Sequence, residues 1–129
     1  MNPDSKVFII GHHGLVGSAI KRNLEAKGYW NLYWTLRDTC DYRDQSRVNT
    51  ILAGAHADCV IIAAAKVGGI HANSTYPAEF IYDNLMIQNN IIDAAYRNGV
   101  KKLMVLGSSC IYPKFAKQPM KEEELLTGE

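Results

Sequence analysis

Two short segments of this sequence carry residue types that could do chemistry. The first, Leu106-Gly-Ser-Ser-Cys-Ile-Tyr-Pro-Lys114, follows an apolar run and places a thiol, Cys110, two residues after a hydroxyl, Ser108. A serine hydroxyl can hydrogen-bond a substrate carbonyl or alkoxide oxygen, and a partly exposed cysteine can move a proton. The same residue types are also ordinary turn and packing residues. Taken alone, this segment leaves both interpretations open.

The second segment is a glycine loop, Gly11-His-His-Gly-Leu-Val-Gly17, between the apolar run Val7–Ile10 and a helical pattern. In nucleotide-binding folds the first glycine permits a tight turn, the second lets the backbone approach a pyrophosphate, and the third lets the helix pack on the strand. The phosphates then bind N–H groups at the positive end of the helix. The spacing here is G-x-x-G-x-x-G, and its position between strand and helix favours nucleotide binding over a plain turn.

Arg37 stands about 20 residues after the loop, where a dinucleotide fold places the residue that contacts the adenosine ribose. An arginine there favours NADP, because its planar donors match a phosphate. The adjacent Asp38 could instead bind the hydroxyl of NAD, and a simple surface ion pair is a third interpretation. His12 and His13 have no partner at metal-ligand spacing, so we predict no metal site. His13 could donate a hydrogen bond to the adenosine phosphate, more strongly at low pH.

Four apolar runs alternate with amphipathic patterns along the chain. This alternation predicts an α/β fold, a Rossmann-like doubly wound parallel sheet. Right-handed crossovers favour four strands in the order 3-2-1-4, in one domain that covers residues 1–129. Residues 121–126 form at most a frayed helical turn. The predicted strands are 7–10, 32–35, 59–65 and 103–106, and the predicted helices are 15–27, 45–53 ended by Gly54, and 77–98.

Composition excludes several classes of protein. Hydrophobic residues make up 47% and charged residues 21%, and the net charge of +1 gives no electrostatic reason to expect a nucleic acid or membrane partner. No apolar stretch approaches the roughly 20 residues that span a bilayer. Cys40, Cys59 and Cys110 form neither a disulfide framework nor a metal pair, so we expect a cytoplasmic protein. We assign Cys59 to packing and give Cys40 no role.

The two chemical segments belong to a larger set of motifs, which runs from about Val7 to the end. The set consists of Gly11-His-His-Gly-Leu-Val-Gly-Ser-Ala19, Ala63-Ala-Ala-Lys-Val-Gly-Gly-Ile70, Asn73-Ser-Thr-Tyr-Pro-Ala78, Phe80-Ile-Tyr82, Leu106–Lys114 and Ala116-Lys-Gln-Pro-Met120. These segments resemble the GDP-L-fucose synthase family, NADPH-dependent epimerase/reductases of the extended short-chain dehydrogenase/reductase superfamily. The Ala-Ala-Lys-Val-Gly-Gly and Gly-Ser-Ser-Cys-Ile-Tyr-Pro segments are specific to that family.

This resemblance implies a reaction and a role for individual residues. The family converts the nucleotide sugar GDP-4-keto-6-deoxy-D-mannose to GDP-L-fucose, by inversion at C3 and C5 followed by reduction of C4 with hydride from NADPH. Ser108 matches the serine that hydrogen-bonds the C4 oxygen, and Cys110 matches the acid/base of epimerisation. The implied NADP(H)-binding residues are Gly11, His13, Gly14, Leu15, Val16, Gly17, Arg37, Asp41, Tyr42, Ala63, Ala64 and Ala65. The resemblance also implies a homodimer through the helix 78–98.

The sequence departs from the family pattern in two places. The family's loop usually reads Gly-His-Arg-Gly, with an arginine that helps to bind the 2′-phosphate, and His13 stands there instead. The family's Tyr-x-x-x-Lys pair, in which the tyrosine delivers the proton for the reduction at C4 and the lysine lowers the pKa of that tyrosine, is absent from this sequence, as is the region that binds the GDP-sugar. We therefore expect a truncated chain that is inactive by itself. A non-catalytic NADP(H)-binding module and a related nucleotide-sugar 4,6-dehydratase or 4-epimerase remain alternatives, although Cys110 argues against the last two.

Overall fold

The structure, a computed structural model, describes residues 1–36 and 39–129, and its core is a sheet of four parallel strands. Every residue of β1 and β3 is buried, because both are continuous apolar runs in the middle of the sheet. The strands are β1 (Val7–Ile10), β2 (Leu32–Tyr33), β3 (Cys59–Ile62) and β4 (Lys102–Val105). The helices are α1 (Leu15–Ala26), α2 (Gln45–Ala55), α3 (Ile70–Thr75) and α4 (Pro77–Arg97), with short 3-10 helices η1 (Ser109–Ile111) and η2 (Glu122–Glu124).

The strand order is β2-β1-β3-β4, so the predicted order 3-2-1-4 is wrong. Val7 of β1 is paired with Leu32 of β2 on one side and with Cys59 of β3 on the other. The reason is burial: β2 has two paired residues, one of them exposed, and suits a sheet edge, whereas the fully buried β3 needs a neighbour on each side. Strand β2 is thus added on one side of β1, and β3 and β4 are added on the other side. In sheets of this kind, ligands bind at the point where the strand order reverses, which here lies between β1 and β3.

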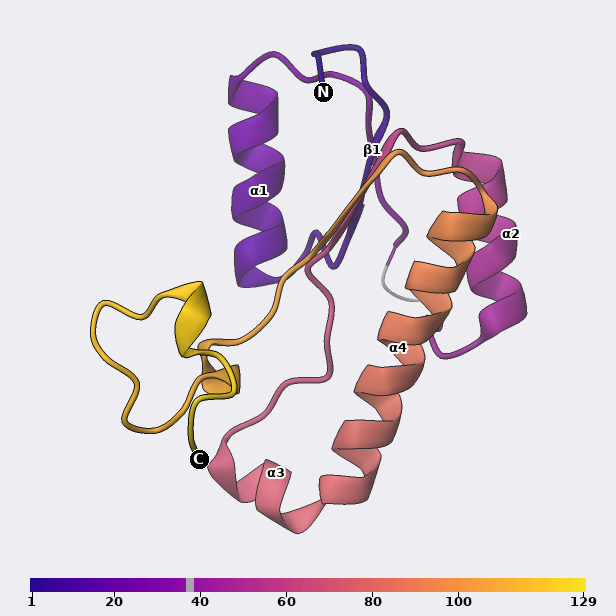
Figure 1. Cartoon of the computed structure of the whole chain (residues 1–129). Coiled ribbons are helices and arrows are strands. Elements are labelled where there is room, and N and C mark those ends of the chain that lie inside the picture. Colours follow the sequence, from indigo (N-terminus) through magenta and orange to yellow (C-terminus); the bar gives the residue numbers. More distant parts are fainter. Residues whose placement is uncertain (37–38) are drawn as a thin grey trace.

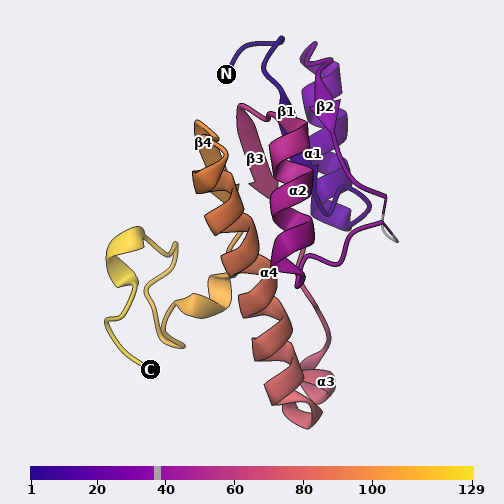
Figure 2. The ribbon, with the colours of Figure 1, turned by 90° about the vertical axis from the view of Figure 1, so that its right-hand side faces the viewer.

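Helices cover both faces of the sheet (Figures 1 and 2), as the α/β prediction requires. On one face Ile20 and Leu24 of α1 pack on the side chains of Val7, Ile9, Cys59 and Ile61. The opposite face contacts α2 and α4, and its core consists of Phe8, Ile10, Val48, Leu52, Val60, Ile62, Ile91 and Ala94, with Cys40 and Ala57. Alternate residues of each strand thus serve opposite layers, and the assignment of Cys59 to packing is confirmed.

The ends of the elements agree with the sequence in some places and differ in others. Helices α1 and α4 are followed by Gly28 and Gly99, which both have positive φ angles, as predicted stops should. Helix α2, in contrast, continues through Gly54 and ends at Ala55, and its C-cap is His56, whose backbone is left-handed. Helix α3 was not predicted, because one and a half turns carry too few residues for a period to be recognised.

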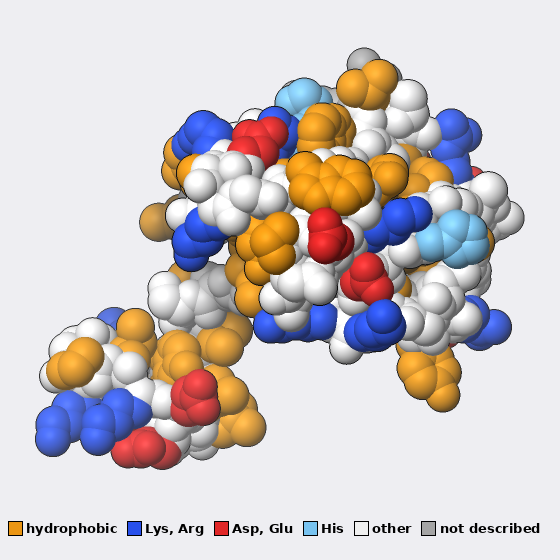
Figure 3. Space-filling model, turned by 90° about the horizontal axis from the view of Figure 1, so that it is seen from above, with side chains coloured by type: hydrophobic (Ala, Val, Ile, Leu, Met, Phe, Trp, Pro, Cys, Tyr) orange, Lys and Arg blue, Asp and Glu red, His pale blue; other side chains and the backbone are white. Residues whose placement is uncertain are grey.

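The residues after β4 form a lobe that projects from the sheet, visible as a separate body in Figure 3. As predicted, the described part of this segment contains no further strand, and residues 122–124 form a single helical turn. None of the helices in the described ranges is both long and apolar enough to cross a membrane.

The close approach of α1 to β1 depends on Gly17. A Cβ at this residue would lie 2.1 Å from the carbonyl oxygen of Gly11. We expect Gly17→Ala to lower the free energy of unfolding by about 1–3 kcal/mol, because backbone must move to admit the methyl group. Urea unfolding followed by circular dichroism measures the effect.

Gly54→Ala is the matched control, because nothing lies within 4 Å of its added Cβ inside α2. The free energy of unfolding of this variant should rise by about 0.5–1 kcal/mol, the usual advantage of alanine over glycine in a helix. Equal unfolding midpoints for the two variants would contradict the close approach at Gly17.

Candidate functional site

The glycine loop connects β1 to α1 and lies directly against the end of β3. Gly11 has a φ of +88°, and a Cβ there would lie 2.7 Å from the carbonyl group of Ala63. The N–H of Gly14 donates to the carbonyl oxygen of Gly11 at 3.0 Å, which closes the turn. Gly14 is also the N-cap of α1 and supplies no side-chain cap. The first N–H groups of the helix therefore remain available to an anion at its positive end.

A cavity of about 540 Å³ opens above this loop, at the ends of β1 and β3. Most of the predicted cofactor residues line it: Gly11, His13, Gly14, Leu15, Val16, Tyr42, Ala63, Ala64 and Ala65. Gly17 does not, because it is buried between α1 and the loop. Asp41 does not line it either, and its carboxylate is paired with Arg43 at 2.7 Å. Arg37 lies outside the described residues.

Four residues that line the same cavity were missed: His12, Thr35, Cys40 and Val67. Cys40 had been given no role, yet it is buried in the core beside this wall. The Thr35 and Tyr42 hydroxyls are hydrogen-bonded to each other across the connection between β2 and α2. In the sequence, Thr35 and Cys40 lie close to Tyr42, which was predicted to bind the cofactor. This proximity is the signal that could have identified them as residues of the same cavity.

The side chains at this wall are held neutral. Burial lowers the pKa of His12, and the neighbouring His13 and Lys21 lower it further. The His12 ring lies 3.8 Å from the His13 ring and 5.2 Å from the Trp34 ring, measured between centroids. Burial also raises the pKa of the Cys40 thiol and raises the pKa of Tyr42 to about 12. Attraction for a bound anion must therefore come from the N-terminus of α1 and from exposed groups rather than from this wall.

Polar side chains of α4 hold the two connections that flank the cavity. Asn90 donates from Nδ2 to the carbonyl oxygens of Tyr42 and Arg43, at 3.1 and 2.8 Å. The nearly buried carboxylate of Asp83 accepts from Arg43 Nη1 at 3.0 Å and from Lys66 Nζ at 2.7 Å. These two cations hold the pKa of Asp83 below its usual value. One helix thus fixes the segments that follow β2 and β3.

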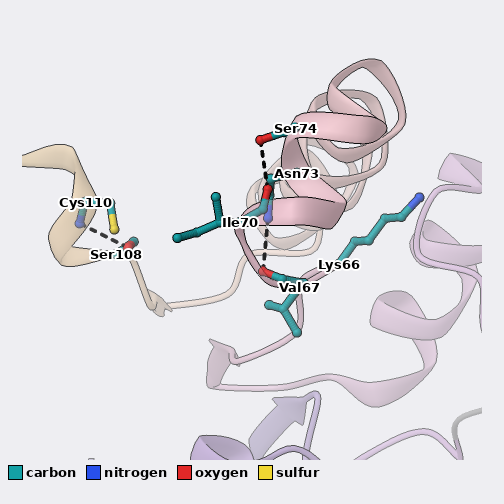
Figure 4. Close-up of a pocket in the computed structure, with 8 residues that line it drawn as sticks. Lys66, Val67, Ile70, Asn73, Ser74, Ser108 and Cys110 are labelled. Carbon is teal, nitrogen blue, oxygen red and sulfur yellow. Dashed lines mark hydrogen bonds between the residues drawn. The ribbon is translucent and has the colours of Figure 1, made fainter.

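A second cavity, of about 590 Å³, lies at the exit of β4 (Figure 4). Ser108 caps η1, and its Oγ accepts a hydrogen bond from the N–H of Cys110 at 3.1 Å. This use of an acceptor lone pair leaves the Ser108 hydroxyl hydrogen for another partner. The Cys110 side chain is exposed. The structure therefore brings the two predicted catalytic residues together, across the cavity from Lys66, Val67, Gly68, Ile70, Asn73 and Ser74.

Comparison with known proteins identifies the family of this chain. Residues 7–129 match the model of the NAD dependent epimerase/dehydratase family. This chain belongs to that family. Among the residues that the structure describes, no group of three or more His, Cys, Asp or Glu side chains could hold a metal ion.

Within the NAD dependent epimerase/dehydratase family, the chain is similar to two GDP-L-fucose synthases and to a reductase of known structure. It is 58% identical over 95% of its length to the GDP-L-fucose synthase of Escherichia coli, and 56% identical over 99% to a putative GDP-L-fucose synthase 2 of Arabidopsis thaliana. It covers 38% and 39% of those relatives. A GDP-mannoheptose C4 reductase from Campylobacter jejuni with NADP bound superposes with a TM-score of 0.92 at 40% identity, over 100% of this chain and 41% of that one.

The buried His12 makes stability depend on pH in a definite direction. Because its pKa is lowered in the folded state, the unfolded chain binds a proton that the folded chain does not, and the free energy of unfolding falls as the pH drops below about 6.5. One such group gives a slope of at most about 1.4 kcal/mol per pH unit. We expect His12→Gln to flatten the stability profile between pH 7 and 5, measured by urea unfolding.

The carboxylates do not contribute to the pH dependence between pH 7 and 5, because they titrate at lower pH. The Asp41 pKa is lowered to about 2, chiefly by its hydrogen bonds with Arg43, so its contribution is lost only as the pH falls below about 4. An unchanged slope between pH 7 and 5 in His12→Gln would show that the His12 pKa is not lowered by burial.

Proposed function

We propose that this chain is the NADP(H)-binding domain, with part of the active site, of an enzyme that converts GDP-4-keto-6-deoxy-D-mannose to GDP-L-fucose. The observation that carries the proposal is that the two cavities adjoin, because Val67 lines both the one above the glycine loop and the one of Ser108 and Cys110. A cofactor and a sugar nucleotide bound in these cavities would meet there. The similarity to GDP-L-fucose synthases at 56 and 58% identity supports this substrate class.

The residues of the first cavity fit a dinucleotide. The backbone of Gly14, Leu15 and Val16, at the N-terminus of α1, would hold the diphosphate. Gly11 and the small Ala63–Ala65 side chains leave room beside the loop, and Tyr42 would contact the adenosine end. The exposed His13 could donate to the 2′-phosphate, and Arg37 remains a predicted contact with it. The NADP-bound heptose reductase, 40% identical, supports NADP(H) over NAD(H).

In the second cavity, Ser108 and Cys110 have complementary tasks. The free hydroxyl hydrogen of Ser108 would donate to the C4 oxygen and polarise the ketone, which acidifies the hydrogens on the neighbouring C3 and C5. The exposed Cys110 would act as one acid/base of this exchange, as thiolate or thiol. Inversion at C3 and C5 also requires a second group on the opposite face of the sugar ring, because the proton must leave from one face and arrive on the other. Bound NADPH would supply the hydride that reduces C4.

We further propose a cytoplasmic homodimer through α4. The support for the dimer is an apolar face on this helix away from the sheet, where the exposed side chains are Ile81, Tyr82, Leu85 and Tyr96. Because α4 also holds the cavity connections through Asp83 and Asn90, a second copy packed on this helix would restrain both cavities.

Cofactor titration tests the proposal directly. We expect the purified chain to bind NADPH saturably and more tightly than NADH, followed by fluorescence of the dihydronicotinamide. The variant Leu15→Asp should weaken NADPH about tenfold or more, because a carboxylate at the first turn of α1 repels the diphosphate while it suits the helix dipole. Leu15 is 88% exposed, so the fold should tolerate the change.

Leu126→Asp is the matched control, since this leucine is 90% exposed and lies in the lobe after β4. Its NADPH affinity should equal that of the unchanged chain. Absence of binding by the unchanged chain, or equal losses in the two variants, would contradict a diphosphate at the glycine loop.

The catalytic part of the proposal has its own test. Because this sequence holds no Tyr-x-x-x-Lys pair, we expect the 129 residues alone to form no GDP-L-fucose from the 4-keto substrate and NADPH, measured by chromatography of the nucleotide sugars. Addition of a polypeptide that supplies that pair should restore product, and Cys110→Ser should then abolish the epimerised product. Turnover by the chain alone would contradict the proposed division of the active site. NADPH binding without any restored turnover would favour the non-catalytic module.

A further inference from the structure

Val67 is the described residue that lines both cavities. Val67 is apolar, yet it is 84% exposed. It follows Ala63–Ala65, which line only the cavity above the glycine loop, and precedes Ile70, which lines only the cavity of Ser108 and Cys110. The segment around Val67 is therefore the boundary between the two spaces.

The direction in which a dinucleotide would lie in the first cavity places its nicotinamide end at this boundary. In folds of this kind the adenosine ribose lies at the end of the second strand, and the diphosphate lies at the N-terminus of the first helix. Here Thr35 and Tyr42 mark the adenosine side of the cavity, beyond β2. Since β2 and β3 flank β1 on opposite sides, the other half of the molecule must extend past Ala63–Ala65 toward Val67. The nicotinamide would then lie between Val67 and the cavity of Ser108.

The segment around Val67 is fixed to α4 by its neighbour, Lys66. The Asn84 amide accepts from the Lys66 N–H at 2.7 Å and donates to the Lys66 carbonyl oxygen at 3.0 Å, so both backbone groups of one residue are bound by one side chain. The Lys66 ammonium pairs with Asp83 at 2.7 Å and lies 5.2 Å from the centre of the Phe80 ring. Figure 4 shows the Lys66 side chain directed away from Ser108 and Cys110. Lys66 thus lines the second cavity but directs its ammonium group toward α4, where it anchors the chain.

We infer that Asn84, with Lys66 and Asp83, positions Val67 as the wall against which the nicotinamide ring is set, facing Ser108 and Cys110. These three are positioning residues, and Val67 is the apolar contact that they present. The inference rests on the proposed function, because it requires a dinucleotide above the glycine loop. Asp83 also binds Arg43 at 3.0 Å, so the same carboxylate ties the adenosine side of the cavity to the nicotinamide side.

The experiment compares a whole dinucleotide with its adenosine half. The dissociation constants of NADPH and of adenosine 2′,5′-bisphosphate are measured on the 129-residue chain and on the variants Asn84→Leu, Val67→Ala and Ile70→Ala. Asn84→Leu keeps the branching of the side chain at Cγ and favours the helix, but it loses both hydrogen bonds to Lys66. Val67→Ala removes an exposed contact and should not affect folding. Ile70→Ala is the control, because Ile70 is 89% exposed and lines only the second cavity.

We expect Asn84→Leu to weaken NADPH by about tenfold and Val67→Ala by about threefold, with the bisphosphate affinity unchanged within about twofold. The fluorescence lifetime of bound NADPH, which reports how firmly the ring is held, should shorten in both variants and not in Ile70→Ala. Equal losses for the two ligands, or no loss of NADPH affinity, would overturn the inference. Failure of the unchanged chain to bind either ligand would instead overturn the proposed function, and a thermal melt of each variant identifies one that is unfolded.

Discussion

The fold of this chain depends on one backbone contact, the approach of α1 to the end of β1. A Cβ at Gly17 would lie 2.1 Å from the Gly11 carbonyl oxygen, and a Cβ at Gly11 would lie 2.7 Å from Ala63. Three elements therefore meet at a point where no side chain fits. This contact aims the N-terminus of α1 across the ends of β1 and β3, and the cavity above the loop exists because these backbones are in contact below it.

Helix α4 supports the irregular connections after β2 and β3, which have no regular backbone hydrogen bonding of their own. Its apolar side packs on the sheet through Ile91 and Ala94, whereas Asp83, Asn84 and Asn90 bind backbone or cationic groups of the connections after β2 and β3. Buried polar groups are costly unless they are paired, and here each pairing also fixes a cavity wall. The same side chains that satisfy the interior thus determine the shape of the site.

Local sequence signals predicted the strands, the longer helices and the parallel sheet, but neither helix α3 nor the order of the strands. The continuous apolar runs of β1 and β3, the glycine loop and the glycines after α1 and α4 each act within a few residues, so they were readable. The strand order was wrong because the order depends on which strand is most buried, and β2 proved to have only two paired residues.

In the candidate site, too, the contacts between neighbours in sequence were predictable and the contacts between distant residues were not. Ser108 and Cys110 are neighbours in sequence and in space, joined by a hydrogen bond. Asp83 is 40 positions from Arg43 and 17 from Lys66, and Asn84 is 18 positions from Lys66. No pattern in the sequence connects them. Cys40 looked like a residue of a polar loop, and only packing against Phe8 and its neighbours shows that it is buried.

The outer side of β4 gives this small sheet an open boundary. In the described ranges β4 pairs with β3 alone, and its Met104 and Val105 side chains, like the following Leu106, are about two-fifths exposed. A strand added there, from the same polypeptide or from another, would gain backbone hydrogen bonds and cover these side chains in one step. Mass action then links the folded population to the supply of that strand. The thermodynamic stability of these residues is accordingly a property of their surroundings as well as of their own sequence.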